Sequence, residues 1–243
     1  MQIAYKSDIG RVADHNEDSL AIWLDQELCL VMVADGVGGH HAGEVASKIA
    51  VHSLQKALLA NNGKNEPEDY LDTLRSAFDG AHQEILQQAS QDDSLAGMAT
   101  TMVLGLFQND KLHVAHVGDS RAYRLQSRHL TPLTQDHSLV AAMVKSGVIT
   151  PREAQNHALK NVITQCLGCP DYLGPEINTF DLAPGDIFLF CSDGLTDMLM
   201  KKKIERVVRW HARRLPQGVE KLVRLANKKG GRDNITVVLA KYE

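Results

Sequence analysis

"LVMVADGVGGHHAGEVA", residues 30–46, begins as an apolar run, reaches a carboxylate at Asp35 and continues through a glycine-rich turn. The apolar part predicts a buried strand that ends at Asp35. A carboxylate followed by bare backbone suits a metal ion or a phosphate, and the helix predicted after the turn would attract an anion to its N-terminus. The turn has neither the Lys-Ser/Thr pair of a P-loop nor the GxGxxG spacing of a dinucleotide site. The rest of the chain has to decide between the two ligands.

Strands and helices are predicted in separate groups along the chain. Apolar and β-branched runs predict strands at 20–24, 28–35, 102–107, 112–118, 121–126, 187–193 and 234–242. Apolar spacing predicts helices over 46–58, 68–90, 204–211 and 219–226, and "TPRE" at 150–153 has the pattern of a helix start with a capping box. Because the strands come in runs and the helices in pairs, we predict the α+β class, with antiparallel sheets covered by helices in one domain over 1–243.

Composition limits the classes of function. The 243 residues are 44% hydrophobic and carry a net charge of -4, which gives no general affinity for nucleic acid or anionic membranes. No apolar run approaches the roughly 20 residues of a membrane span, and the N-terminus has no apolar signal core. The basic stretch at 201–214 is interpreted as the solvent-facing side of a core helix and not as a nucleic-acid site. We therefore expect a cytoplasmic protein without membrane or nucleic-acid partners.

The four cysteines favour a reduced compartment. Cys29 and Cys191 lie in apolar strand-like runs, where a thiol usually behaves as a small hydrophobe. "CLGC" at 166–169 has CxxC spacing, but no second pair completes a zinc site. We therefore expect reduced cysteines without a metal or redox role.

Carboxylates recur where predicted strands begin or end. Asp35-Gly36 and Asp193-Gly194 both close apolar runs, and three more aspartates flank other strands: Asp18, Asp119 and Asp233. Any single Asp-Gly is most simply a turn, and spacing alone does not show that the five converge. If they do converge, their repulsion requires a cation between them, and oxygen ligands suit magnesium or manganese. The backbone carbonyl of Gly36 would be a further ligand.

The sequence resembles the metal-dependent protein phosphatases, the type 2C serine/threonine phosphatases, in their compact bacterial form. The family's motifs occur in order from end to end: "SDIGRVADHNEDS", "VADGVGGHHAGEVAS", "ATTMVLGLF", "VGDSRAYRL", "LTQDHSLV", "NVITQCLG", "GDIFLFCSDGLTDML" and "GGRDNITVV". The resemblance implies two antiparallel β-sheets sandwiched between pairs of α-helices. It also implies hydrolysis of phosphoserine and phosphothreonine by a water that two metal ions activate, with no enzyme nucleophile.

The resemblance also assigns the catalytic and metal-binding residues. Asp35 would bridge two Mn²⁺ or Mg²⁺ ions, with the Gly36 carbonyl on one of them. Asp193 and Asp233 would hold the other ion, and Asp18 would sit beside them, mostly through waters.

Further residues would support this centre. Asp119, together with Asp193, would hold a weaker third ion, while Glu17 and Asn234 would support the ligands without being ligands themselves. The segment 135–158 would form a mobile flap beside the site.

Two positions depart from the family pattern. Some members place a histidine directly after the Asp-Gly, but this chain has Val37 there, so a metal-bound water or, less simply, His40 would protonate the leaving oxygen. His40 and His41 could equally serve only in packing. The family also carries a phosphate-binding arginine where this chain has Ala13. If the stretch is extended, Arg11 lies on the same face and could partly replace that arginine. The alternative is that Arg11 is a solvated surface charge and the metals alone hold the phosphate.

Three functions fit these observations. The first is an active protein phosphatase that opposes a bacterial serine/threonine kinase and acts on that kinase and its targets, as a monomer. The second is a catalytically weak regulator that binds phosphoproteins, which only Ala13 favours. The third is a phosphatase for small phosphorylated metabolites, which the retained flap disfavours. The intact Asp35, Asp193 and Asp233 favour the first.

Overall fold

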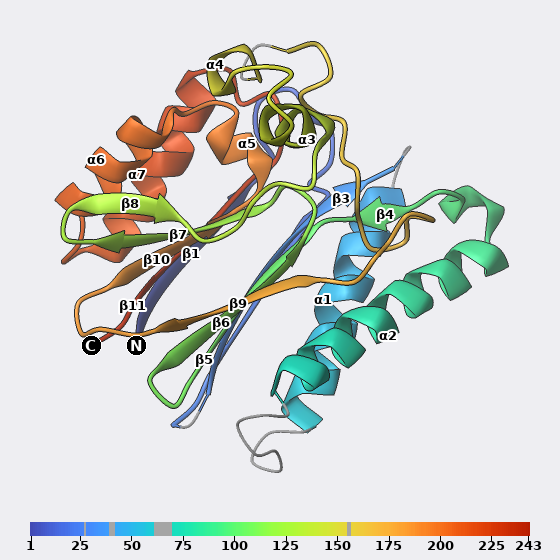
Figure 1. Ribbon diagram of the computed structural model, residues 1–243, viewed down its shortest axis with the longest axis horizontal. Helices are drawn as coiled ribbons and strands as arrows, with labels where there is room; N and C mark the ends of the chain where they lie inside the picture. The colour runs from blue at the N-terminus through green and yellow to red at the C-terminus, as the bar shows by residue number, and fades with distance from the viewer. Residues whose placement is uncertain (27, 39–41, 61–69, 155–156) are drawn as a thin grey trace.

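The structure, a computed structural model, describes residues 1–26, 28–38, 42–60, 70–154 and 157–243 (Figure 1). His40 and His41, for which a catalytic and a packing role were both considered, lie outside the described residues, as do residues 155–156 of the expected flap.

Two antiparallel sheets face each other at the centre of the molecule (Figure 1). The first sheet has the order β1 (Gln2–Asp8), β11 (Ile235–Lys241), β10 (Ile187–Cys191), β7 (Arg121–Gln126) and β8 (His129–Pro132). The second has the order β2 (Asp18–Leu24), β3 (Cys29–Val37), β5 (Met102–Gln108), β6 (Lys111–Val117) and β9 (Glu176–Asp181), and β4 (Ala99–Thr100) also pairs with β3.

Helix pairs cover the outer face of each sheet (Figure 1). The helices α1 (Ala42–Ala60) and α2 (Tyr70–Gln91) pack on the second sheet, and α6 (Lys201–Trp210) and α7 (Leu215–Lys228) pack on the first. Three short helices gather at one end, α3 (Leu139–Lys145), α4 (Pro151–Ala154) and α5 (Asp193–Thr196), and a 3₁₀ turn, η2 (Asp93–Leu95), follows α2. The α+β prediction, with two antiparallel sheets between helix pairs, is confirmed. No described helix combines the length and apolar character that a bilayer crossing requires.

The strand β3 explains why its sequence is apolar without alternation. Leu30, Met32 and Ala34 pack against α1 and α2, whereas Val31 and Val33 pack between the two sheets. A strand buried on both faces needs apolar side chains at every position. The run is therefore interrupted only where the strand leaves the core, at Asp35.

Candidate active site

Strand pairing brings the first two aspartates together. In the register of β2 and β3, Asp18 lies directly opposite Asp35. Like charges at such a position repel each other, so this pair costs stability unless something offsets it. The backbone around Asp35 is held firmly: its N–H donates to Thr101 Oγ1 at 3.0 Å, and its carbonyl accepts from Thr101 N and Thr100 Oγ1, both at 2.9 Å.

The first sheet contributes to the same place through Ser192, the residue before Asp193. The hydroxyl of Ser192 donates to Asp18 Oδ2 at 2.8 Å and accepts from the N–H of Thr236 at 3.0 Å. A side chain from the end of β10 therefore orients a carboxylate on β2, across the two sheets. This role of Ser192 was not predicted from sequence, although its position directly before Asp193 could have indicated a contact with the carboxylates.

The glycines that follow the aspartates are required by close packing. A Cβ on Gly36 would lie 2.2 Å from the carbonyl oxygen of Gly43, in the first turn of α1. A Cβ on Gly194 would lie 2.0 Å from the carbonyl oxygen of Asn234. Both distances are far below van der Waals contact, so no side chain fits at either position. The bare backbone thus lets α1 and the start of β11 approach the carboxylates.

Burial and mutual repulsion both raise the pKa of these carboxyls when no cation is bound. Burial is the main cause for Asp18, whose pKa rises to about 7 although hydrogen bonds from Thr236 and Ser192 oppose the shift. Burial likewise raises the pKa of Asp35 and Asp193 well above 3.8, and the neighbouring carboxylates add to it. Each carboxylate that raises the pKa of Asp35 belongs to the five aspartates predicted from sequence: Asp18, Asp193, Asp119 and Asp233.

Asp119 is buried next to an ion pair. Burial raises its pKa to about 6, with a further increase from Asp136 and an opposing effect of Arg121. Arg121 binds Asp136 through two hydrogen bonds, of 2.8 and 2.6 Å. Asp136 lies at the start of the expected flap, so this bidentate pair connects the flap to the strand that follows Asp119. The pair was not predicted, because Arg121 begins β7 and Asp136 follows β8, so only the pairing of these two strands brings them together.

Asn234 holds the loop that precedes β2. Its side-chain amide donates to the carbonyls of Ile9 and His15, both at 2.9 Å, and its Oδ1 accepts from Glu17 N at 2.8 Å. The carbonyl of Glu17 in turn accepts from Ser47 Oγ at 2.6 Å. Asn234 and Glu17 therefore fix the approach to Asp18 through backbone contacts.

The premise for Arg11 is wrong. The strand β1 ends at Asp8, Gly10 has a φ of +86°, and Arg11 lies in the turn at 10–12, so Arg11 and Ala13 do not share one face of an extended chain. Arg11 is exposed, and its N–H donates to the Gly231 carbonyl at 2.7 Å. The sequence analysis overlooked that Gly10 permits this turn.

Backbone hydrogen bonds join His137, near the start of the expected flap, to the end of β6 and to Thr164, which follows the flap. The backbone N–H of His137 donates to the Gly118 carbonyl at 2.9 Å, and the carbonyl of His137 accepts from Thr164 N at 2.8 Å. Inside the flap, the predicted capping box is confirmed: Thr150 N donates to Glu153 Oε2 at 2.7 Å, and Glu153 N donates to Thr150 Oγ1 at 3.3 Å. The backbone contacts place His137 beside Gly118, the residue before Asp119, and Thr164 beside His137.

Among the described residues, His116, His137 and Glu176 form the group with metal-ligand character, their ligand atoms lying within 4.8 Å of one another. The geometry favours a hydrogen-bonded role instead. His116 Nε2 bonds to the Gln135 carbonyl at 2.8 Å, and Gly118 N donates to His137 Nδ1 at 3.3 Å. If a metal bound His137 Nε2, the ring proton would sit on Nδ1. It would then point at the Gly118 N–H, which needs Nδ1 as its acceptor. The two stacked imidazoles thus support the flap.

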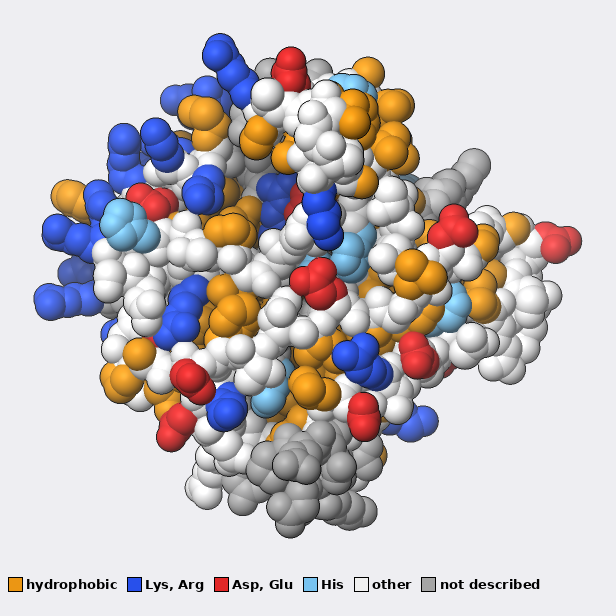
Figure 2. Space-filling model, viewed as in Figure 1, with side chains coloured by type: hydrophobic (Ala, Val, Ile, Leu, Met, Phe, Trp, Pro, Cys, Tyr) orange, Lys and Arg blue, Asp and Glu red, His pale blue; other side chains and the backbone are white. Residues whose placement is uncertain are grey.

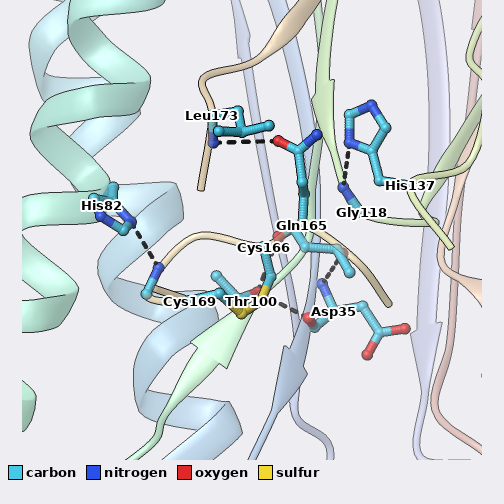
Figure 3. Close-up of a disulfide and its surroundings, with 11 residues drawn as sticks. Asp35, His82, Thr100, Gly118, His137, Gln165, Cys166, Cys169 and Leu173 are labelled. Atoms are coloured by element: carbon cyan, nitrogen blue, oxygen red, sulfur yellow. Dashed lines mark hydrogen bonds between the residues drawn. A yellow bond between two sulfur atoms is a disulfide. The ribbon is translucent and has the colours of Figure 1, made fainter. Parts of the chain in front are cut away.

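The CxxC pair contradicts the expectation of reduced cysteines, because Cys166 and Cys169 form a disulfide (Figure 3). The loop between them lies against the segment that positions Asp35. Leu167 and Thr100 exchange two backbone hydrogen bonds, of 2.9 and 3.0 Å, and Thr100 Oγ1 bonds to the Asp35 carbonyl. Cys29 and Cys191 are free and buried, as expected.

The donor set fits hard divalent cations. The site offers carboxylate and carbonyl oxygens, which magnesium and manganese prefer. Asp18 Oδ1 is buried without a hydrogen-bond partner among the described residues, which is costly for a carboxylate unless an ion takes the place of water. A cation would also reverse the repulsion that raises the pKa of these groups.

Comparison with known proteins decides the family. The model of the family described as protein phosphatase 2C matches residues 11–238. The chain belongs to this protein phosphatase 2C family. It is 36% identical to the serine/threonine phosphatase stp of Listeria monocytogenes, over 100% of this chain and 96% of that protein.

Solved structures agree with this assignment. The S. agalactiae serine/threonine phosphatase superposes with a TM-score of 0.92 at 34% identity, covering 100% of this chain and 99% of that one. The catalytic domain of the phosphatase PstP, solved in complex with 2 manganese ions, has a TM-score of 0.84 at 34% identity, covering 99% and 97%. The predicted family is therefore confirmed, and the chain is an enzyme of the phosphatase class.

Proposed function

We propose that this chain is a metal-dependent protein phosphatase that removes phosphate from phosphoserine and phosphothreonine in proteins. The observation that carries the proposal is the convergence of aspartates from both sheets on one buried place, with Asp18 facing Asp35 and Ser192 reaching across to Asp18. Two findings support the proposal: the chain belongs to the protein phosphatase 2C family, and over its whole length it resembles serine/threonine phosphatases in sequence and in fold.

The ligands are proposed as follows. Asp35 would serve both ions, the Gly36 carbonyl would serve one of them, and Asp193 and Asp233 would hold the other, with Asp18 beside them. Asp119 contributes to a weaker third. When bound, Mn²⁺ or Mg²⁺ would activate a water and offset charge on the phosphoryl oxygens. The 2 manganese ions in the PstP complex support two ions here.

The chain's own residues keep these ligands in place before substrate arrives. Ser192 orients Asp18, Thr100 and Thr101 fix the backbone of Asp35, and Asn234 pins the loop before Asp18. Ligands held by surrounding hydrogen bonds need little rearrangement in the reaction. We propose that Arg11 is a solvated surface charge and that the metals alone hold the phosphate, since Arg11 is exposed and lies in a turn.

We further propose the biological setting. The whole chain, 1–243, acts as one catalytic domain with 135–158 as its flap, and works as a monomer in the cytoplasm against a serine/threonine kinase and that kinase's targets. The exposed flap segments α3 and α4 support protein substrates over small metabolites, since they offer a surface beside the site. The alternative, a catalytically weak regulator that binds phosphoproteins, is disfavoured by the complete aspartate set.

The test is hydrolysis of a phosphothreonine peptide at defined metal concentration. Activity should require added manganese or magnesium, vanish with excess chelator, and fall by several orders of magnitude in Asp193→Asn, because the variant loses charge at the site where ions bind. The exposed Asp171→Asn is the matched control and should keep full activity. Full activity in excess chelator would overturn the metal-dependent proposal.

A further inference from the structure

Charge is divided very unevenly along this chain. Residues 201–229, which span α6 and α7, contain 11 of the 26 lysines and arginines but only 2 of the 30 acids. This segment therefore carries a formal charge of +9, while the rest of the chain carries -13. Such segregation within a protein of small net charge indicates a surface that favours a partner of opposite sign.

The fold turns these cations outward. The apolar faces of α6 and α7 are buried against the first sheet through Ile204, Val208, Leu222 and Val223. The basic side chains consequently gather on the opposite face, where Figure 2 shows lysine and arginine over the α6–α7 region at the left of the view. The face is a consequence of helix amphipathicity, so it does not depend on the position of any single side chain.

A groove of about 710 Å³ runs between the two helices on this face. Its lining combines cations with one large aromatic ring: Lys203, Arg206, Trp210, Lys221 and Arg224. Trp210 is 85% exposed, which is unusual for the largest apolar side chain and is typical of residues that become buried on binding.

The lysine and arginine side chains of this groove are available to bind an acidic partner. Both acids of the segment are already engaged, since Glu205 accepts from Leu130 N at 2.9 Å and Glu220 pairs with Lys6 at 2.7 Å. Among the described residues, no carboxylate forms an ion pair with Lys203, Arg206 or Arg224. An incoming acidic group would therefore not have to displace an internal partner.

We propose that this α6–α7 groove docks an acidic segment of a protein partner, rich in Asp and Glu with an apolar residue that packs on Trp210. A short peptide fits because the favourable charge is confined to one helix pair, whereas a long polyanion such as duplex nucleic acid would extend over a remainder that carries -13. The inference adds a specificity site to the proposed function and rests on it only for the identity of the docked protein as substrate.

The helix pair that forms the groove also contacts an element of the aspartate cluster. Helix α7 contacts α5, which begins with Asp193. A substrate that engages both sites gains affinity because the second contact is intramolecular. Proteins with a phosphosite near an acidic segment are therefore the expected substrates.

Binding is tested without catalysis, on the full chain. The probes are a fluorescein-labelled peptide of alternating Glu and Ser with one central Leu, and its counterpart in which every Glu is replaced by Gln. The acidic peptide should bind selectively and perturb the fluorescence of Trp210, and Arg206→Glu/Arg224→Glu should weaken it by about 10-fold or more, the effect of reversing two exposed charge contacts. The control Lys56→Glu/Arg75→Glu makes the same charge change on exposed positions of α1 and α2 and should leave binding unchanged.

Catalysis provides the second readout. For phosphothreonine peptides with a Glu-rich or a Gln-rich tail, the wild type should show a lower KM for the acidic one, and Arg206→Glu/Arg224→Glu should remove that preference. Turnover of p-nitrophenyl phosphate should not change, which separates loss of docking from loss of the active site. The proposal is overturned if neither peptide distinguishes wild type from this variant, or if the variant instead loses binding to duplex RNA or to anionic vesicles while acidic peptides never bind.

Discussion

Replacing Asp18 with asparagine should make the metal-free protein less sensitive to pH and more stable at pH 7.5 relative to wild type. Asp18 is buried opposite Asp35, and one of its oxygens has no partner among the described residues. Its folded-state pKa is about 7, against 3.8 as the ordinary value. The folded protein therefore binds a proton that the unfolded chain releases, and wild-type stability falls as the pH rises between these two values.

The size of the effect follows from the shift. A displacement of about 3 pKa units at 1.36 kcal/mol per unit amounts to about 4 kcal/mol once both states are ionised. At pH 5 only about 1 to 2 kcal/mol of this loss has developed. Asparagine does not titrate, so the stability of Asp18→Asn minus that of wild type should increase by about 2 to 3 kcal/mol from pH 5 to pH 7.5. A fixed cost of the buried amide cancels in this comparison.

Urea denaturation in excess chelator at the two pH values measures the difference. The exposed Asp171→Asn should show no change between them and controls for net charge. With manganese present the order should reverse at pH 7.5, because wild type gains binding free energy that the variant lacks. An identical stability difference at pH 5 and pH 7.5 would show that Asp18 does not carry the unfavourable charge, and the electrostatic account of the cluster would fail.

Three further perturbations probe the surroundings of the cluster. Gly36→Ala should lower stability by roughly 2 to 3 kcal/mol in thermal or urea unfolding, since its Cβ would meet the Gly43 carbonyl, whereas Gly80→Ala, with open space around it in α2, should be neutral or stabilising. Arg121→Ala should raise the pKa of Asp119 further, so the manganese concentration for half-maximal activity should rise more at pH 6 than at pH 8; an equal rise at both would assign Arg121 to the flap alone. Ala13→Arg should lower KM for a phosphopeptide while Arg11→Ala leaves it unchanged, and a clear rise of KM in Arg11→Ala would restore the replacement hypothesis.

The central strands and the edge strand β2 were predictable from sequence, whereas the other edge strands were not. The strand predicted at 121–126 coincides with β7, and the strand predicted at 28–35 overlaps β3, which runs over Cys29–Val37. Central strands bury apolar side chains, and these leave a clear pattern in the sequence. No sequence pattern predicted β1, β8 or β9, which each pair with a neighbour on one side only, whereas the edge strand β2 was predicted at 20–24 because its Leu20 and Ile22 pack against the core between the sheets. Edge strands such as "EINTFD" are half-exposed, so backbone pairing defines them more than hydrophobicity does.

The site shows a similar division. Strand ends with Asp-Gly were visible in the sequence, but the pairing of Asp18 with Asp35 depends on the register of β2 and β3, which no spacing reveals. The sequence shows that glycine follows Asp35 but not why it is required. The reason is the close approach of the Gly43 carbonyl, which only the folded structure reveals. The hypothesis that Arg11 replaces the missing arginine loses its basis for a related reason. It assumed an extended chain, and a turn at Gly10 interrupts that geometry.

The distribution of ion pairs explains how a buried cluster of aspartates can stay available for metal. The cations near the site bind flanking acids: Arg121 pairs with Asp136, and Lys160 pairs with Asp197. Among the described residues, no lysine or arginine pairs with Asp18, Asp35 or Asp193, and 11 of the chain's 26 lysines and arginines lie in residues 201–229, the segment of α6 and α7. A lysine within the cluster would neutralise it and compete with a divalent ion. Segregating the cations therefore serves two ends at once, since it leaves the carboxylates to the metal and concentrates positive charge where an acidic protein segment can bind.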